Sequence, residues 1–220
     1  MKKTDVLKQL IDCLYADDNP ERENGAYYMS DFLGYMNSRT ERGSRALRSV
    51  RGGQTGEIID QWSNTESDIS IMLVLMYRYA RGYVKKVLKN SILQTADEFS
   101  FLMTLMTNDS LTKTDLINRQ VMEKTSGTDV IKRLLKYGQI TEFRDETDGR
   151  SLRVAITDKG RQTIISILPE MSVISKIIAG NLTPEEINTF AYLLRKLDNF
   201  HNDIFMNMRK ASIPEISKLI

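Results

Sequence analysis

The chain has 220 residues, 41% of them apolar, and 31 lysines and arginines against 29 acidic residues give a formal net charge of +2. This length and apolar share permit one or two domains with a sizeable core. The single cysteine, Cys13, excludes an internal disulfide and a cysteine-cluster metal site, and the single histidine, His201, excludes a histidine pair. A metal site made of carboxylates alone stays open but has no spacing to support it, so we expect no metal and no cofactor.

Neither a membrane protein nor an enzyme is expected. Met1-Lys-Lys is followed by charged and polar residues, and the sequence contains no long apolar run of the kind that forms a signal or membrane-spanning segment. We therefore expect a cytoplasmic protein with no membrane partner. The chain has no Gly-rich phosphate loop and no nucleophile paired with a base. The small net charge means that basic residues must be concentrated locally if the partner is nucleic acid.

Residues 1–60 are predicted to form a helical N-terminal extension. Asp5 to Tyr15 has helical apolar spacing, Asp17-Asp-Asn-Pro20 breaks it, and Gly52-Gly53 reads as a hinge or loop. Between them, arginines recur every third residue at Arg39, Arg42, Arg45, Arg48 and Arg51. This stripe is either a solvated helix face or a surface that reaches phosphates or acids of a partner chain.

Residues 66–92 carry a broad helical apolar stripe, and residues 161–210 carry two more, separated at Gly180. Pro169 is expected to kink the first of these two, while Thr183 and Pro184 start the second as N-cap and first helical residue. Three such faces exceed what one small domain can bury, so they predict dimerisation helices in a homodimer.

The stretch from Leu111 to Lys159 is predicted to be a winged helix-turn-helix, within a domain of residues 95–160. Asp97 to Thr107 is expected to be a core helix, with its Met and Phe residues used for packing. Thr112-Lys-Thr-Asp115 is an N-cap signal for a short helix, and a second helix follows from about Lys124 to Tyr137. Its buried face is predicted to hold Val130, Ile131, Leu134 and Leu135.

A two-stranded β-hairpin is predicted after Gly138. Ile140 alternates with polar residues, a turn-forming run extends from Arg144 to Arg150, and Leu152, Val154 and Ile156 are β-prone. Thr157 or Asp158 is expected to cap the next helix. Helix, turn, helix and hairpin in this order are typical of a module that lays its second helix in the DNA major groove.

The particular residues of this module resemble those of the MarR family of bacterial transcription regulators, over roughly Asp68 to Asn207. The matching segments are Leu134-Leu-Lys-Tyr-Gly138 after the second helix, Asp145-Glu-Thr-Asp-Gly-Arg150 at the wing tip and Ile156-Thr-Asp-Lys-Gly160 at the close. The resemblance implies a mainly α fold with a small β-hairpin wing, namely a winged helix-turn-helix plus long N- and C-terminal dimerisation helices. It also implies a homodimer that binds double-stranded DNA.

The resemblance places DNA contacts on the second helix and the wing. Thr125 could instead only cap the helix, the lysines could be merely solvated, and Arg150 could form an ion pair with Asp145 or Asp148. Asp145 and Asp148 are expected to structure the wing, and Arg150 to enter the minor groove. The expected DNA-binding residues are Lys113, Lys124, Thr125, Ser126, Thr128, Lys132, Arg144, Arg150 and Arg153.

Two residues of the second helix depart from the family pattern. Asp129 stands where a basic residue is frequent, and it could repel phosphate, accept from a cytosine amino group or pair with Arg133. Gly127 is expected to add flexibility early in the helix.

Regulation by a ligand is a further implication of the resemblance. A small aromatic effector would lie in a crevice lined by Tyr77, Tyr79, Tyr83 and Met103, although these residues could equally be ordinary core. Redox sensing through Cys13 is disfavoured, because Asp12, Asp17 and Asp18 would raise the pKa of its thiol.

These observations predict a dimeric, sequence-specific DNA-binding transcriptional regulator, more often a repressor in such families, that reads two half-sites of an imperfect palindrome. The alternative is a winged-helix protein-interaction module without specific DNA readout.

Overall fold

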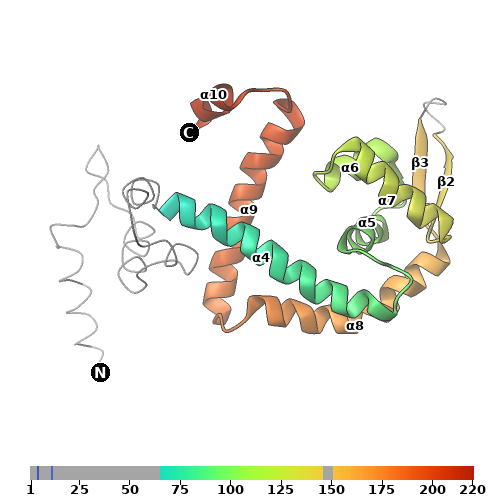
Figure 1. The fold of residues 1–220 in the computed structure, drawn as a ribbon, viewed down its shortest axis with the longest axis horizontal. Coiled ribbons are helices and arrows are strands. Elements are labelled where there is room, and N and C mark those ends of the chain that lie inside the picture. Colours follow the sequence, from blue (N-terminus) through green and yellow to red (C-terminus); the bar gives the residue numbers. More distant parts are fainter. Residues whose placement is uncertain (1–3, 5–10, 12–64, 146–150) are drawn as a thin grey trace, which may run out of the picture. The chain divides into compact units, whose positions relative to one another are not determined.

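The computed structural model describes Thr4, Ile11, residues 65–145 and residues 151–220, so the predicted extension, its arginine stripe, Cys13, Asp148 and Arg150 lie outside the described residues. The chain divides into two compact units, Met1–Val74 and Leu75–Ile220, and the second contains the winged helix-turn-helix (Figure 1). The helices are α4 (Thr65–Val87), α5 (Ala96–Met106), α6 (Lys113–Arg119), α7 (Lys124–Lys136), α8 (Asp158–Ala179), α9 (Pro184–Asn207) and α10 (Ile213–Ile216). The strands are β1 (Leu111–Thr112), β2 (Ile140–Arg144) and β3 (Leu152–Ile156), and short 3-10 helices span Leu88–Asn90 and Ser217–Leu219.

Helix α5 lies at the centre of the core. Thr95 caps it by accepting a hydrogen bond from the backbone N–H of Glu98, and Phe101, Leu102 and Leu105 are fully buried. The helix packs against α7, α8 and β3. The predicted core helix is confirmed, but the residue that fills its centre is Phe101, while Phe99 and Met103 pack at the margin of the core.

The helix-turn-helix consists of α6 and α7. Thr112 caps α6, as predicted, by accepting from the backbone N–H of Asp115 at 3.0 Å. Helix α7 buries Val130, Ile131 and Leu134, and it ends before Gly138, whose φ of 65° lies in the left-handed region that glycine adopts without a steric penalty.

Gly127 is needed for close packing, not for flexibility, so that expectation was wrong. It is buried in α7, and a Cβ at this position would lie 2.6 Å from Cγ1 of Ile117 in α6. The absence of a side chain lets the two helices approach each other at this point.

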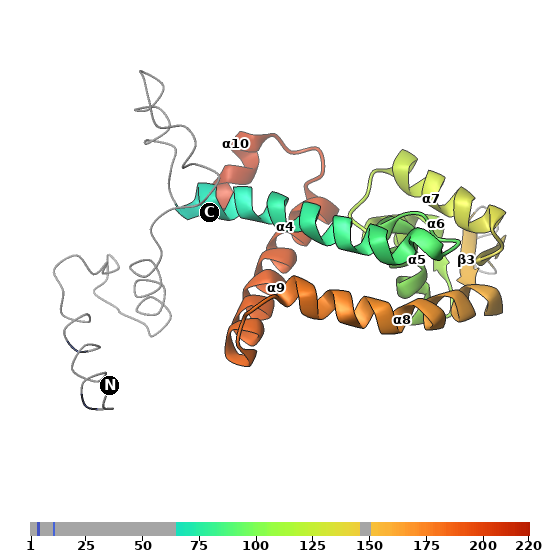
Figure 2. The same ribbon diagram turned by 60° about the horizontal axis from the view of Figure 1, so that its bottom comes forward.

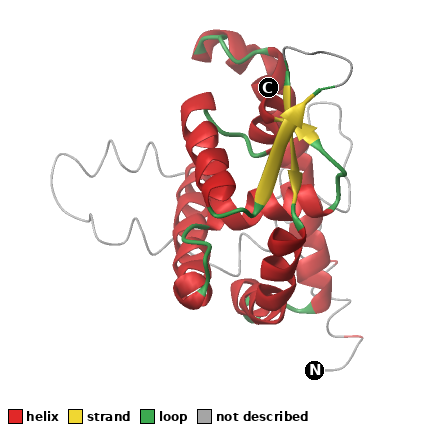
Figure 3. Cartoon of the chain, turned by 90° about the vertical axis from the view of Figure 1, so that its right-hand side faces the viewer, coloured by secondary structure: helices red, strands yellow, loops and turns green. Residues whose placement is uncertain are grey.

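The predicted pairing of the two wing strands is confirmed by β2 and β3, and β1 adds a further strand to their antiparallel sheet (Figure 3), in the order β1-β3-β2. β2 and β3 pair from Ile140 opposite Ile156 to Arg144 opposite Leu152, and Leu111 of β1 lies opposite Val154. The two residues of β1 are too few to show the alternation by which a strand is recognised in a sequence. Val154 is fully buried and ties the sheet to the core.

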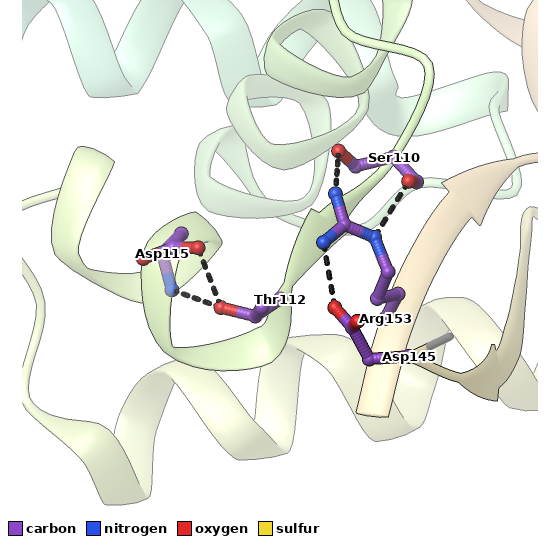
Figure 4. A network of polar contacts seen from close by, with 5 residues as sticks. All are labelled: Ser110, Thr112, Asp115, Asp145 and Arg153. Atoms are coloured by element: carbon purple, nitrogen blue, oxygen red, sulfur yellow. Dashed lines mark hydrogen bonds and ion pairs between the residues drawn. The ribbon is translucent and has the colours of Figure 1, made fainter. Parts of the chain in front are cut away.

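Arg153 fastens the base of the wing to the segment before β1 (Figure 4). Its Nε donates to the Ser110 hydroxyl at 2.8 Å and one terminal nitrogen donates to the Ser110 carbonyl at 2.9 Å. The other terminal nitrogen bonds the Asp145 carboxylate at 2.8 Å, and that carboxylate is almost fully buried. The planar guanidinium therefore joins three acceptors at fixed angles.

Helices α8 and α9 follow the wing, joined by a short turn at Gly180 (Figure 2). Thr157 caps α8, and Thr183 caps α9 in a reciprocal capping box with Glu186, with Pro184 in the first turn, as predicted. By length and composition alone α8 could span a membrane, but core helices share these properties, and Ile164 and Ile167 of α8 lie in the core. Helix α9, by contrast, has no buried residue.

We expect Arg153→Lys to lower the free energy of unfolding by about 1–2 kcal/mol, because lysine keeps the ion pair with Asp145 but cannot also bond both Ser110 acceptors. Chemical denaturation measures this change. Unchanged stability together with weaker DNA binding would contradict a structural role and favour direct DNA contact by Arg153.

Candidate nucleic-acid interface

The solvent-facing side of α7 lies opposite its buried side. At about 100° per residue, Thr125, Lys132 and Lys136 point away from the face that holds Val130 and Leu134. All three are exposed. A helix with a polar, mostly basic outer face on a rigid scaffold can enter a groove of DNA. Lys136 was not among the expected contacts, although its position four residues after Lys132 on the same face was a signal for it.

The first turn of α7 presents further polar groups. Lys124 and Ser126 are exposed, whereas Thr128 is half-buried and its hydroxyl donates to the Lys124 carbonyl at 2.6 Å. The N-cap is Glu123, with no side-chain cap bond, so the alternative that Thr125 only caps the helix is wrong. The Thr125 and Ser126 side chains are the hydroxyls at this end of the helix that face solvent.

Asp129 pairs with Lys132 and not with Arg133. The Lys132 ammonium lies 3.3 Å from the Asp129 carboxylate, and both side chains are largely exposed. An ion pair this exposed contributes little to stability. Asp129 does, however, place a negative charge in the middle of the outward face.

Arg133 contacts Glu98 of α5 instead, and its own side chain stays 38% exposed. Its Nε lies 2.6 Å from Glu98 Oε1, and the Glu98 side chain is fully buried. The other carboxylate oxygen accepts from the backbone N–H of Gln94, whose side-chain amide donates to the Tyr137 hydroxyl. The C-terminal half of α7 is thereby held on α5. The spacing Thr95-x-x-Glu98 is typical of a capping motif, but it does not point to this partner of Glu98 35 residues away.

The wing and its surroundings hold the other expected residues. Lys113 of α6 forms an ion pair with Glu142 of β2, and Arg144 is exposed at the end of β2. Asp145 is bound to Arg153 as described above. Among the described residues near the wing, Lys113 and Arg153 are thus paired within the fold, whereas Arg144 extends into solvent.

The residues expected to line an effector pocket differ in their surroundings. Tyr77 and Tyr79 are 59% and 55% exposed, the Lys86 ammonium lies 5.9 Å from the centre of the Tyr83 ring, and Met103 packs against the core. A cleft of about 270 Å³ does open between the start of α8 and the segment after α4. Its lining consists of Val87, Asn90, Ser91, Ile92, Thr163, Ser166, Ile167 and Glu170. The tyrosine crevice stays a prediction.

Within residues 65–145 and 151–220, no group of three or more His, Cys, Asp or Glu side chains is placed to hold a metal ion. The polar clusters of this part of the chain join one element of the fold to another, as Glu98 and Arg153 do.

Comparison with known proteins gives a consistent answer. Residues 83–167 match the family model of the transcriptional regulator SarA/Rot. Among solved structures, BpsR of Bordetella bronchiseptica, whose DNA binding is regulated by 6-hydroxynicotinic acid, is 25% identical with a TM-score of 0.55, over 59% of this chain and 98% of that one. The comparison with curated proteins gave no match.

Two further structures have the same fold. A mutant MarR from E. coli in complex with operator DNA has a TM-score of 0.56 at 19% identity, over 66% of this chain and 99% of that one. A MarR transcriptional regulator from Methanosarcina mazei has a TM-score of 0.53 at 24% identity, over 60% of this chain and 94% of that one. Residues 83–167 therefore match the SarA/Rot transcriptional regulator family, the fold is the winged helix-turn-helix fold of MarR regulators, and the protein is a DNA-binding transcriptional regulator.

Proposed function

We propose that the protein is a non-enzymatic, cytoplasmic repressor that binds a pseudo-palindromic operator as a homodimer. The observation that carries this proposal is the outward face of α7, where Thr125, Lys132 and Lys136 are exposed opposite the buried side. Lys124, Ser126 and Thr128 extend the surface at the helix start. Arg144, exposed at the end of β2, supplies positive charge for flanking phosphates or the minor groove, and from the sequence Arg150 is expected to contact DNA as well.

The homodimer is supported by the exposed apolar residues of α8 and α9. Ile187, Phe190 and Leu194 lie on one side of α9 and are 40%, 46% and 37% exposed, and Ile165 and Val173 of α8 are more exposed still. An amphipathic helix of this length needs a partner surface for its apolar side. A second copy of the chain supplies one, and its two-fold symmetry sets the two α7 helices on two half-sites.

Release by a small effector completes the proposal. It rests on the effector-regulated DNA binding of BpsR, which shares the fold, and on the tyrosines near the end of α4. The effector would be aromatic, because Tyr77, Tyr79 and Tyr83 offer ring faces for stacking.

Fluorescence anisotropy tests the proposed DNA binding. The purified protein is titrated onto DNA from upstream of its own gene and onto a scrambled fragment, over a series of salt concentrations. Tighter binding to the upstream fragment, with an affinity that falls steeply with salt, is the expected result. Equal, weak binding to both fragments, retained in a Lys124→Ala, Arg150→Ala double variant, would favour a protein-interaction module.

Asp129→Asn tests whether the Asp129 carboxylate repels phosphate or accepts a hydrogen bond from a base. We expect tighter binding to the upstream fragment, because the change removes a charge that repels phosphate and frees Lys132 from its pair. The slope of log affinity against log salt should steepen by about 0.9 if Lys132 gains one phosphate. Weaker binding, confined to fragments with a particular base pair, would show instead that Asp129 accepts from a cytosine.

Phe190→Glu tests the dimer. A charge on the apolar side of α9 is expected to weaken self-association by about tenfold or more and operator binding with it, since burying an unpaired charge is costly. Tyr192→Glu is the matched control, because Tyr192 is also exposed but lies about 200° further round the helix. Light scattering coupled to gel filtration measures the mass. A dimer that survives Phe190→Glu, or one that both changes dissociate equally, would refute this interface.

A further inference from the structure

The C-terminal end of α9 returns to the start of the DNA-reading helix. The Arg209 side chain, two residues beyond α9, donates to the Met122 carbonyl and to the Glu123 carboxylate, each at 3.2 Å. Its guanidinium carbon also lies 4.4 Å from the centre of the Phe205 ring in the last turn of α9. Residues 86 positions apart in the chain are thus joined at the helix-turn-helix.

The segment that Arg209 contacts has backbone hydrogen bonds to the end of α6 but lacks a side-chain cap for α7. Glu123 is the N-cap of α7 but makes no side-chain cap bond, which leaves the first backbone N–H groups of the helix without that usual partner. Two residues earlier, Val121 has a φ of 51°, in the left-handed region that β-branched residues rarely adopt. The chain therefore enters α7 from a strained turn, and Arg209 bonds the two residues that separate this turn from the helix.

Charge gives the contact a second effect. Glu123 precedes Lys124, Thr125 and Ser126, which form the proposed DNA-contacting turn, and 78% of its side chain is exposed. A free carboxylate at this place would repel phosphate. A guanidinium beside it cancels that charge, and the aromatic ring of Phe205 limits where the guanidinium can lie.

We propose that Arg209 is a positioning residue for DNA binding, which fixes the start of α7 and neutralises Glu123 from the end of the C-terminal helix. This inference rests on the proposed use of α7 as the DNA-reading helix. An exposed ion pair contributes little to global stability, so its effect should appear in DNA affinity rather than in unfolding.

A set of three variants tests the proposal by anisotropy on the upstream DNA fragment. Arg209→Ala is expected to weaken binding about fivefold. Lys210→Ala is the matched control, since it removes the same charge one residue along from an exposed side chain with no ion pair among the described residues, and it should change affinity less than about twofold. Glu123→Gln should restore binding in the Arg209→Ala background, because the charge that Arg209 neutralises is then gone. Equal losses for Arg209→Ala and Lys210→Ala, or no restoration by Glu123→Gln, would overturn the proposal.

Hydrogen exchange gives a readout that does not depend on DNA. The backbone N–H groups of Gln120, Val121, Met122 and Gly127 are hydrogen-bonded around the turn and the first turn of α7. They should exchange faster in Arg209→Ala than in Lys210→Ala, with the melting temperature unchanged. Identical exchange in the two variants would overturn the positioning role. Faster exchange combined with a wild-type protein that binds no DNA would instead count against the proposed function.

Discussion

The buried carboxylate of Glu98 is the constraint on which the proposed DNA-binding surface depends. A charge with no exposure to solvent must be compensated within the fold, because removing one partner of such a pair leaves a large desolvation cost. Here the compensation comes from Arg133 on α7 and from the backbone N–H of Gln94. Because the Arg133 guanidinium must reach this carboxylate, α7 cannot rotate about its axis. The contacts on the inner side of α7 therefore determine which of its residues face solvent.

The remaining contacts around α7 act at different points along its length. Gly127 sets how closely α7 approaches α6 near its start, and Val130, Ile131 and Leu134 anchor its middle in the core. Beyond its end, Arg153 holds the sheet that carries the wing. Helix and wing are thus fixed to one core by contacts of different chemistry, so a ligand or partner that moves the core as a whole moves both reading elements together.

Signals that lie within a few residues of one another were sufficient to predict the elements. Thr112, Thr157 and Thr183 each cap the helix that follows, because the acceptor and its donor are three residues apart. The pairing of Arg133 could not be found in this way, since the i+4 partner Asp129 was the nearer candidate and the true partner is on another helix. Strand β1 was not predicted because it has only two residues. The contacts of Arg209 were not predicted because its partners are 86 and 87 residues away in the chain. The contacts that position the site mostly join residues far apart in the sequence. The helices and strands that form the site, by contrast, are specified by residues close together in the sequence.

Helix α9 is 24 residues long, and none of its residues is buried in the part of the chain that the structure describes. An isolated helix of this composition gains little from its backbone hydrogen bonds alone, so in the proposed dimer its folding and the association of two chains become one equilibrium. By mass action, the number of assembled molecules then rises with the square of the chain concentration while monomers predominate. A given fold-change in the amount of protein, through synthesis or degradation, would in that regime produce a larger fold-change in the concentration of the DNA-binding dimer.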